Sequence, residues 1–233
     1  MMNVTMRSEY WEKNWDKLVE EKEDIQLVSG WGNRKFQEML FAINDTSKKL
    51  DLKCQDTLLD IGCGAGIFEI AFTHWVKEID AVDFSSEMVK LAKKQTISYS
   101  NVNIQRANIK ALPYKNEYFD KLLVNGVIQY LDSMDEVKKA IQELNRVLKN
   151  DGILCLSLIP DAEKRDDFLN GFYSLGLREN QIRDRIEKNS NIIWFSKETI
   201  LDLLDTSGFI SYTIEKPCIE FLNKYFFDVV VTK

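Results

Sequence analysis

The sequence contains a single histidine, His74, among its 233 residues. This scarcity excludes metal sites built from several histidines and most nucleophilic triads, which use a histidine as their base. The four cysteines, at positions 54, 63, 155 and 218, show no C-x-x-C spacing, so we expect neither a zinc site nor a redox motif nor an iron–sulfur triplet. We interpret them as small apolar residues in a reducing compartment.

Long apolar runs are also missing, since the longest, ILCLSLI, is far too short to cross a bilayer. The N-terminal MMNVTMRSEYWEKNWDKL is charged and aromatic and has no apolar stretch of signal-peptide length, so we expect no signal peptide there. The net charge of −6 disfavours a nucleic-acid partner, because neutralising phosphates requires clustered Lys and Arg. We therefore expect a cytoplasmic protein with no membrane or nucleic-acid partner. Its 45% hydrophobic content suits a single domain over residues 1–233.

Apolar strand patterns alternate with amphipathic helical patterns from about residue 35 to the end, which predicts a parallel sheet. The predicted strands are 57–61, 78–83, 102–107, 119–124, 152–159, 211–216 and 226–233. The predicted helices are 36–50, 67–76, 85–95, 135–149 and 196–208. The expected fold class is α/β, a doubly wound and mostly parallel seven-stranded sheet with an antiparallel C-terminal strand and helices on both faces.

The stretch LLDIGCGAG, residues 58–66, places three glycines at alternate positions between the first strand and the next helix. Ligands bind at this edge of a parallel sheet, and glycine lets the backbone turn or lie against them. A nucleotide of the NAD type and S-adenosylmethionine are the two candidates. The dinucleotide pattern G-x-G-x-x-G is broken by Ile67 at its sixth position. Asp60 would repel a pyrophosphate but can pair with an α-ammonium, directly or through water.

LLDIGCGAG closely matches the first motif of the class I S-adenosylmethionine-dependent methyltransferases, and the sequence resembles that family from about residue 33 onward. In this resemblance, Asp83 of AVDFSSEM corresponds to the ribose-binding acid, with Phe84 against the adenine. ANIKALPY resembles the adenine-reading segment, where Asn108 stands in a place more often held by Asp. NGVIQYL resembles the loop at the methionine end, with Asn125 and Gly126 contributing largely through backbone.

The resemblance implies a Rossmann-like fold with S-adenosylmethionine as cofactor, S-adenosylhomocysteine as product and no metal. The implied cofactor-binding residues are Asp60, Gly62, Cys63, Gly64, Gly66, Asp83, Phe84, Met88, Asn108, Ile109, Asn125, Gly126 and Val127. Purely structural roles stay open as alternatives for several of these residues. Asp83 would also suit a helix N-terminus, and Phe84 would also suit the core.

Methyl transfer from a sulfonium mainly requires two partners held in line in a dry pocket. Tyr130 is the candidate catalytic residue, at a position where many members of the similar family carry His. A hydroxyl with a pKa near about 10 is a poor base at neutral pH, so orienting the acceptor is its alternative role.

Two segments outside the shared core are expected to hold the acceptor. Residues 1–32 form a predicted lid helix carrying Tyr10, Trp11 and Trp15, with plain packing as the alternative. Residues 161–195 form a predicted cap carrying Tyr173 and Arg178, longer than a connection requires. Aromatic and guanidinium groups suit a sugar or a phosphorylated or carboxylated metabolite, although a solvated surface fits the balanced charges of the cap as well.

The sequence thus predicts methyl transfer from S-adenosylmethionine to O or N of a small-molecule acceptor. The alternatives are a non-catalytic S-adenosylmethionine-binding partner protein and, with less support, an NAD-linked oxidoreductase. The composition leaves open whether the protein is a monomer or a homodimer.

Overall fold

The computed structural model describes residues 5–21 and 35–233. Residues 1–4 and 22–32 of the predicted lid therefore lie outside the described residues. No helix within 5–21 or 35–233 has the length and apolar character that a membrane crossing requires.

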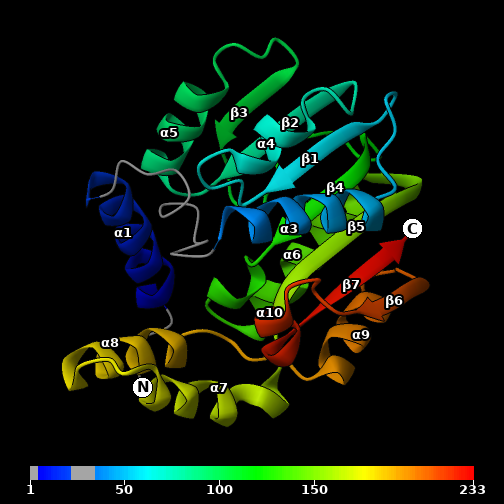
Figure 1. Ribbon diagram of the computed structural model, residues 1–233. Coiled ribbons are helices and arrows are strands. Elements are labelled where there is room, and N and C mark those ends of the chain that lie inside the picture. The colour runs from blue at the N-terminus through cyan, green and yellow to red at the C-terminus, as the bar shows by residue number, and fades with distance from the viewer. Residues whose placement is uncertain (1–4, 22–34) are drawn as a thin grey trace.

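A seven-stranded sheet forms the centre of the fold (Figure 1). In spatial order its strands are β3 (Val102–Arg106), β2 (Glu78–Asp83), β1 (Thr57–Ile61), β4 (Phe119–Asn125), β5 (Leu148–Pro160), β7 (Phe226–Thr232) and β6 (Ser211–Glu215). The first five run parallel, and β7 is antiparallel to both of its neighbours. The predicted mostly parallel sheet with an antiparallel C-terminal strand is confirmed.

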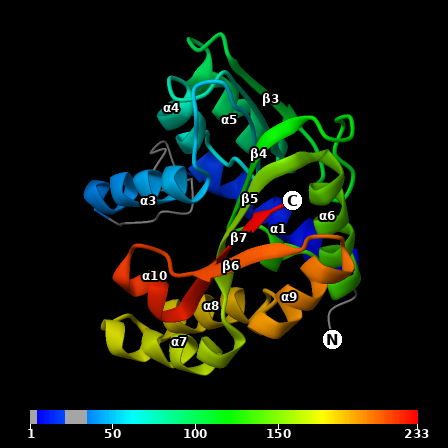
Figure 2. The same ribbon diagram turned by 90° about the vertical axis from the view of Figure 1, so that its right-hand side faces the viewer.

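Helices cover both faces of the sheet (Figure 2). One face carries α3 (Phe36–Lys49), α4 (Ile67–Phe72) and α5 (Ser86–Thr96), and the other carries α6 (Met134–Val147) and α9 (Lys197–Thr206). In α6 the buried Val137, Ile141 and Leu144 recur at helical spacing. The hydroxyl of Ser133 caps this helix by accepting the Glu136 N–H. Such apolar stripes hold the layers together.

The remaining helices lie at the carboxyl end of the parallel strands, as α1 (Thr5–Glu21), α7 (Arg165–Gly171) and α8 (Glu179–Ser190) do in Figure 1. A short helix that the sequence pattern did not predict, α10 (Glu220–Tyr225), joins β6 to β7. A 3₁₀ turn, Ile128–Tyr130, follows β4 after Gly126 and Val127. These segments enclose the edge of the sheet at which the glycine motif lies.

Candidate cofactor-binding site

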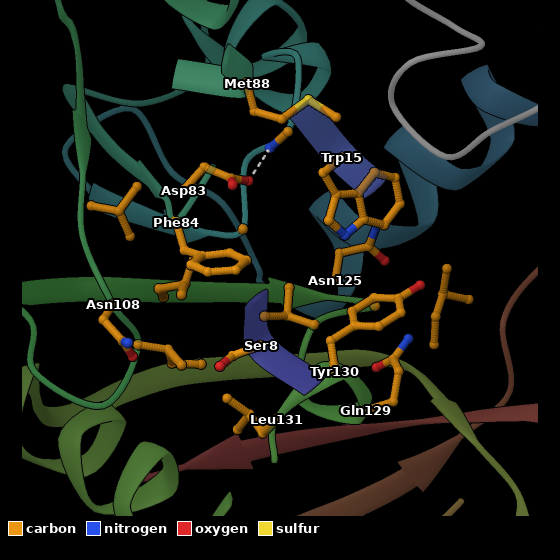
Figure 3. Close-up of a pocket in the computed structure, with 18 of the residues that line it drawn as sticks. Ser8, Trp15, Asp83, Phe84, Met88, Asn108, Asn125, Gln129, Tyr130 and Leu131 are labelled. Carbon is orange, nitrogen blue, oxygen red and sulfur yellow. Dashed lines mark hydrogen bonds between the residues drawn. The ribbon is translucent and has the colours of Figure 1, made fainter. Parts of the chain in front are cut away.

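A cavity of about 290 Å³ opens at the carboxyl edge of the sheet, beside the glycine loop (Figure 3). Twelve residues singled out from the sequence line it: Trp15, Gly62, Gly64, Asp83, Phe84, Met88, Asn108, Ile109, Asn125, Gly126, Val127 and Tyr130. They lie at or beyond the carboxyl ends of four strands, or on α1 and α5. The parallel topology brings them together, since the carboxyl ends of these strands meet at one edge.

All three glycines of the loop have a positive φ, at which a side chain would be strained, and Gly62 and Gly64 also line the cavity. Gly62 has a φ of +80°, and a Cβ added there would lie 2.3 Å from Val127 Cγ2, so the loop after β4 packs directly on its backbone. Gly64 has a φ of +54°, but no atom lies within 4 Å of its added Cβ. The backbone at Gly64 therefore borders open space that a ligand can occupy. Gly66 begins α4 and packs against α5 instead of lining the cavity.

Asp83 links the end of β2 to the glycine loop. Its Oδ2 accepts the Gly64 N–H at 2.9 Å, and its Oδ1 accepts the Ser85 N–H at 2.9 Å. Burial raises the pKa of Asp83, and these backbone hydrogen bonds oppose the rise. Each carboxylate oxygen retains acceptor capacity, so Asp83 can bind a pair of hydroxyl groups while it holds the loop.

Next to Asp83, Phe84 and Asn108 border the same side of the cavity (Figure 3). Phe84 is half-buried, and Ile109, the residue after Asn108, is buried. Asn108 is exposed, and its Oδ1 accepts the Lys110 N–H at 3.0 Å. This end of the cavity thus offers apolar faces together with one amide group.

Asp60 and Cys63 do not line the cavity. Asp60 is 1% exposed, and it lies beside Glu69 of α4, which is fully buried. Burial raises the pKa of Asp60 well above its ordinary value, and the neighbouring Glu69 raises it further. Contact between Asp60 and an ammonium group, one of the roles expected from the sequence, therefore requires a water or a rearrangement of the loop.

Tyr130, from the 3₁₀ turn after β4, lines the cavity beneath α1. Its ring centroid lies 4.5 Å from that of Trp11 and 5.8 Å from that of Trp15. Burial raises the pKa of Tyr130 to about 12, although the adjacent Gln129 side chain opposes this shift. The phenol therefore stays protonated at neutral pH and can orient a ligand but not remove a proton from it.

Helix α1 is fastened across the cavity at both of its ends. The Ser8 N–H donates to Asp132 Oδ1 at 2.8 Å, and the Ser85 hydroxyl donates to Asp16 Oδ1 at 2.6 Å. Trp11 is 8% exposed and packs between Tyr10 and the site. Ser8 and Trp15 line the cavity, whereas Tyr10 and Trp11 only support it.

The segment 161–195 forms α7 and α8, but it does not bring Tyr173 or Arg178 to the cavity. Both side chains are exposed. The cavity residues not expected from the sequence include Ser8, Gln129, Leu131, Leu158, Leu222 and Phe226. Gln129 and Leu131 belong to the NGVIQYL loop, so that loop already carried a signal for them.

Within the described part of the chain, no three His, Cys, Asp or Glu side chains gather as metal ligands.

The family model described as "Methyltransferase domain" matches residues 59–156. An uncharacterized methyltransferase of Bacillus subtilis is 32% identical over 127 residues, which cover 53% of this chain and 49% of that protein. An uncharacterized protein of Methanocaldococcus jannaschii is 31% identical over 151 residues, covering 65% and 63%. The chain thus spans about half of the length of the first relative and less than two thirds of the length of the second.

Among solved structures, the fold resembles phosphoethanolamine N-methyltransferase 1 of Haemonchus contortus in complex with phosphoethanolamine and S-adenosylhomocysteine. The TM-score is 0.74 at 16% identity, and the match covers 99% of this chain and 50% of that one. At this identity the likeness concerns the fold.

Proposed function

Because this chain carries a methyltransferase domain on the class I S-adenosylmethionine-dependent fold, we propose that it transfers a methyl group from S-adenosylmethionine to O or N of a small-molecule acceptor. The observation that carries this proposal is the open space beside Gly64, next to the carboxylate of Asp83 and the ring of Phe84 in one cavity. Hydroxyl acceptors, an aromatic face and exposed backbone together suit an adenosine with an attached amino acid.

The residues present fit this cofactor. Asp83 would accept the ribose hydroxyls, Phe84 and Ile109 would flank the base, and backbone at Asn125 and Gly126 would meet the amino-acid end. When bound, S-adenosylmethionine supplies an activated methyl group. The chain itself contributes positioning and exclusion of water, since α1 covers the cavity and Trp15 and Tyr130 border it.

The carboxylates bordering the cavity, among the described residues, are Asp83 and Glu136. Asp83 is engaged by two amides, and Glu136 forms an ion pair with Lys110. Burial acts to raise the pKa of Glu136, but hydrogen bonds from Lys110 and the Asp132 N–H outweigh it and lower the pKa. His74 is exposed and lies away from the cavity. The proposed reaction accordingly relies on proximity and not on a strong base.

Titration calorimetry with S-adenosylhomocysteine and with NAD tests the cofactor. We expect S-adenosylhomocysteine to bind and NAD not to bind. Asp83→Ala should weaken S-adenosylhomocysteine binding by about 30-fold to 1000-fold, because two charge-assisted hydrogen bonds are lost. Asp83→Asn, which keeps one accepting oxygen, should lose less. Unchanged affinity in Asp83→Ala would show that the ribose lies elsewhere.

A methyl-release assay across pools of small metabolites separates an enzyme from a non-catalytic binder. We expect S-adenosylhomocysteine to accumulate with at least one pool. Tight cofactor binding without release in any pool would favour the binding-protein alternative.

A further inference from the structure

The side-chain amide of Gln129 is a buried polar group that the cofactor assignment does not use. Gln129 is 5% exposed, borders the cavity and has an enclosed Oε1 with no hydrogen-bond partner in the described residues. Its backbone is fixed, because its carbonyl oxygen accepts the Ile193 N–H at 2.8 Å. A buried amide oxygen without a donor costs free energy, and such a cost persists where a ligand supplies the missing hydrogen bond.

Apolar and aromatic side chains line the cavity that Gln129 borders. Trp15, Tyr130 and Phe226 border the cavity, as do Leu158 of β5 and Leu222 of α10. In the sheet, β4, β5 and β7 lie on one side of β1, whereas β2 and β3 lie on its other side. Figure 3 accordingly shows Gln129 and Tyr130 across the cavity from Asp83 and Phe84. The amide therefore belongs to the end of the cavity away from the proposed adenosine end.

Charged side chains border the opposite end. Among the described residues, the charged side chains that line the cavity are Asp83, Lys110 and Glu136. Asp83 ends β2, Lys110 follows β3 and Glu136 lies on α6. Lys110 and Glu136 are paired with each other. No cation of the described cavity lining is thus available beside Gln129 to bind a phosphate or carboxylate, and no carboxylate is available to remove a proton.

We propose that Gln129 accepts a hydrogen bond from the N–H of an uncharged amine, and that the methyl acceptor is such an amine on an apolar or aromatic body. This inference rests on the function proposed above. The terminal torsion of Gln is broad, so the bound N–H can draw Oε1 toward the cavity. The hydrogen bond fixes the amine and leaves its lone pair free to attack.

An uncharged amine suits this site better than a hydroxyl because it needs no base before it reacts. Its lone pair forms the N–CH₃ bond while the bond from methyl to sulfur breaks with its electron pair going to sulfur. The resulting ammonium then loses its proton to water. The faces of Trp15, Tyr130 and Phe226 are suited to the positive charge that develops on nitrogen.

Matched probes test this proposal on the full chain saturated with S-adenosylhomocysteine. The probes are para-toluidine, its N,N-dimethyl derivative without an N–H, and para-aminobenzoate, which adds a carboxylate. Dissociation constants are measured by ligand-observed NMR on the wild type, on Gln129→Met and on the control Gln142→Met, which changes an exposed glutamine of α6. Methionine keeps the length of the side chain and removes the amide.

We expect para-toluidine to bind about fivefold to tenfold more tightly than the dimethyl derivative in the wild type and in Gln142→Met. Para-aminobenzoate should bind most weakly. In Gln129→Met the preference for the N–H should disappear, while S-adenosylhomocysteine affinity stays within about twofold.

Three results would overturn the proposal: no binding of para-toluidine, a preference for para-aminobenzoate, or weaker S-adenosylhomocysteine binding in Gln129→Met with the probes unaffected. The last would place Gln129 at the cofactor. The probe comparison in the wild type holds even if Gln129→Met fails to fold. Failure of S-adenosylhomocysteine to bind the wild type is a separate result, which would overturn the proposed function and this inference with it.

Discussion

Asp60 and Glu69 form a buried pair of carboxyl groups beneath the glycine loop. No other side chain of the described residues donates a hydrogen bond to their carboxyl oxygens. The two groups can therefore be satisfied by sharing one proton, through which one carboxyl donates to the other. Burial raises the pKa of Glu69 from 4.5 to about 7, and it raises that of Asp60 as well. Two such carboxyl groups in contact cannot both ionise without a large cost, so the pair keeps one proton at neutral pH.

This pair should make the folded state less stable as the pH rises. Burial raises the pKa of both Asp60 and Glu69 in the folded protein, whereas the unfolded chain releases both protons near the ordinary pKa values of these groups. Between the ordinary and the raised pKa values the folded state binds more protons, so the free energy of unfolding falls with increasing pH. Glu69→Gln should reduce this fall, because its amide donates to Asp60 without titrating. We expect a gain of about 1 to 3 kcal/mol over the wild type at about pH 8.

Urea unfolding of the ligand-free protein at several pH values measures this difference. Glu179→Gln, at an exposed position of α8, serves as the control and should follow the wild type. Parallel pH profiles for the wild type and Glu69→Gln would contradict a shared proton at this pair.

At the residue scale, the sequence predicts positions that a motif fixes along the chain. Gly64 was predicted because it belongs to the glycine motif after the first strand, and Asp83 was predicted because AVDFSSEM resembles the ribose-binding segment of the similar family. The partners of such residues are harder to predict. The burial of Glu69 beside Asp60 depends on how α4 packs on the loop, and the orientation of Gln129 depends on a 3₁₀ turn that has no periodic pattern.

At the element scale, α1 closes the cavity through a few specific contacts. Asp16 Oδ1 accepts the Ser85 hydroxyl at 2.6 Å, and Ser85 in turn caps α5 by accepting the Met88 N–H. Asp16→Ala should therefore loosen α1 over the cavity. We expect S-adenosylhomocysteine to dissociate severalfold faster, while the free energy of unfolding changes by less than about 1 kcal/mol, because the other contacts of α1 remain.

Stopped-flow dissociation measures this effect, and Lys17→Ala is the matched control, since Lys17 is an exposed residue of the same helix. Hydrogen exchange in residues 5–21 should increase in Asp16→Ala only. An unchanged dissociation rate together with faster exchange would mean that α1 does not limit ligand release.

Whether an element could be predicted depended on its length and pattern. The sequence predicted a lid helix within residues 1–32, but nothing in its pattern shows where α1 docks. The six residues of α10 follow Pro217 and are too few to show a helical period, yet they bring Leu222 to the cavity. The cap over residues 161–195 was predicted from the length of that segment, which gave no information on the direction of its side chains, and neither Tyr173 nor Arg178 borders the cavity.

At the scale of the whole molecule, the alternation of strand and helix patterns was enough to predict the parallel sheet. The side chains that join distant elements leave no such pattern. Lys49, at the end of α3, donates to Asp228 Oδ2 at 2.6 Å, and β7 carries this aspartate. Asp228 Oδ1 accepts the Leu158 N–H at 2.8 Å, where Leu158 has a φ of +56°. A buried ion pair between α3 and β7 thus holds a strained residue of β5 at the cavity.

Lys49→Met should remove this support and leave Asp228 as an uncompensated buried charge. Burial alone would lower the pKa of Lys49, but Asp228 and Asp45 raise it above its ordinary value, so the lysine is charged at neutral pH. We expect Lys49→Met to lower the free energy of unfolding by about 3 to 5 kcal/mol. Adding Asp228→Asn should restore more than about 1 kcal/mol, because the amide oxygen still accepts the Leu158 N–H and no charge is left unpaired.

Urea unfolding of the two single variants and the double variant gives the coupling energy, with Asp45→Asn as a milder control. Effects that add within about 0.5 kcal/mol would show that the pair does not act as one unit.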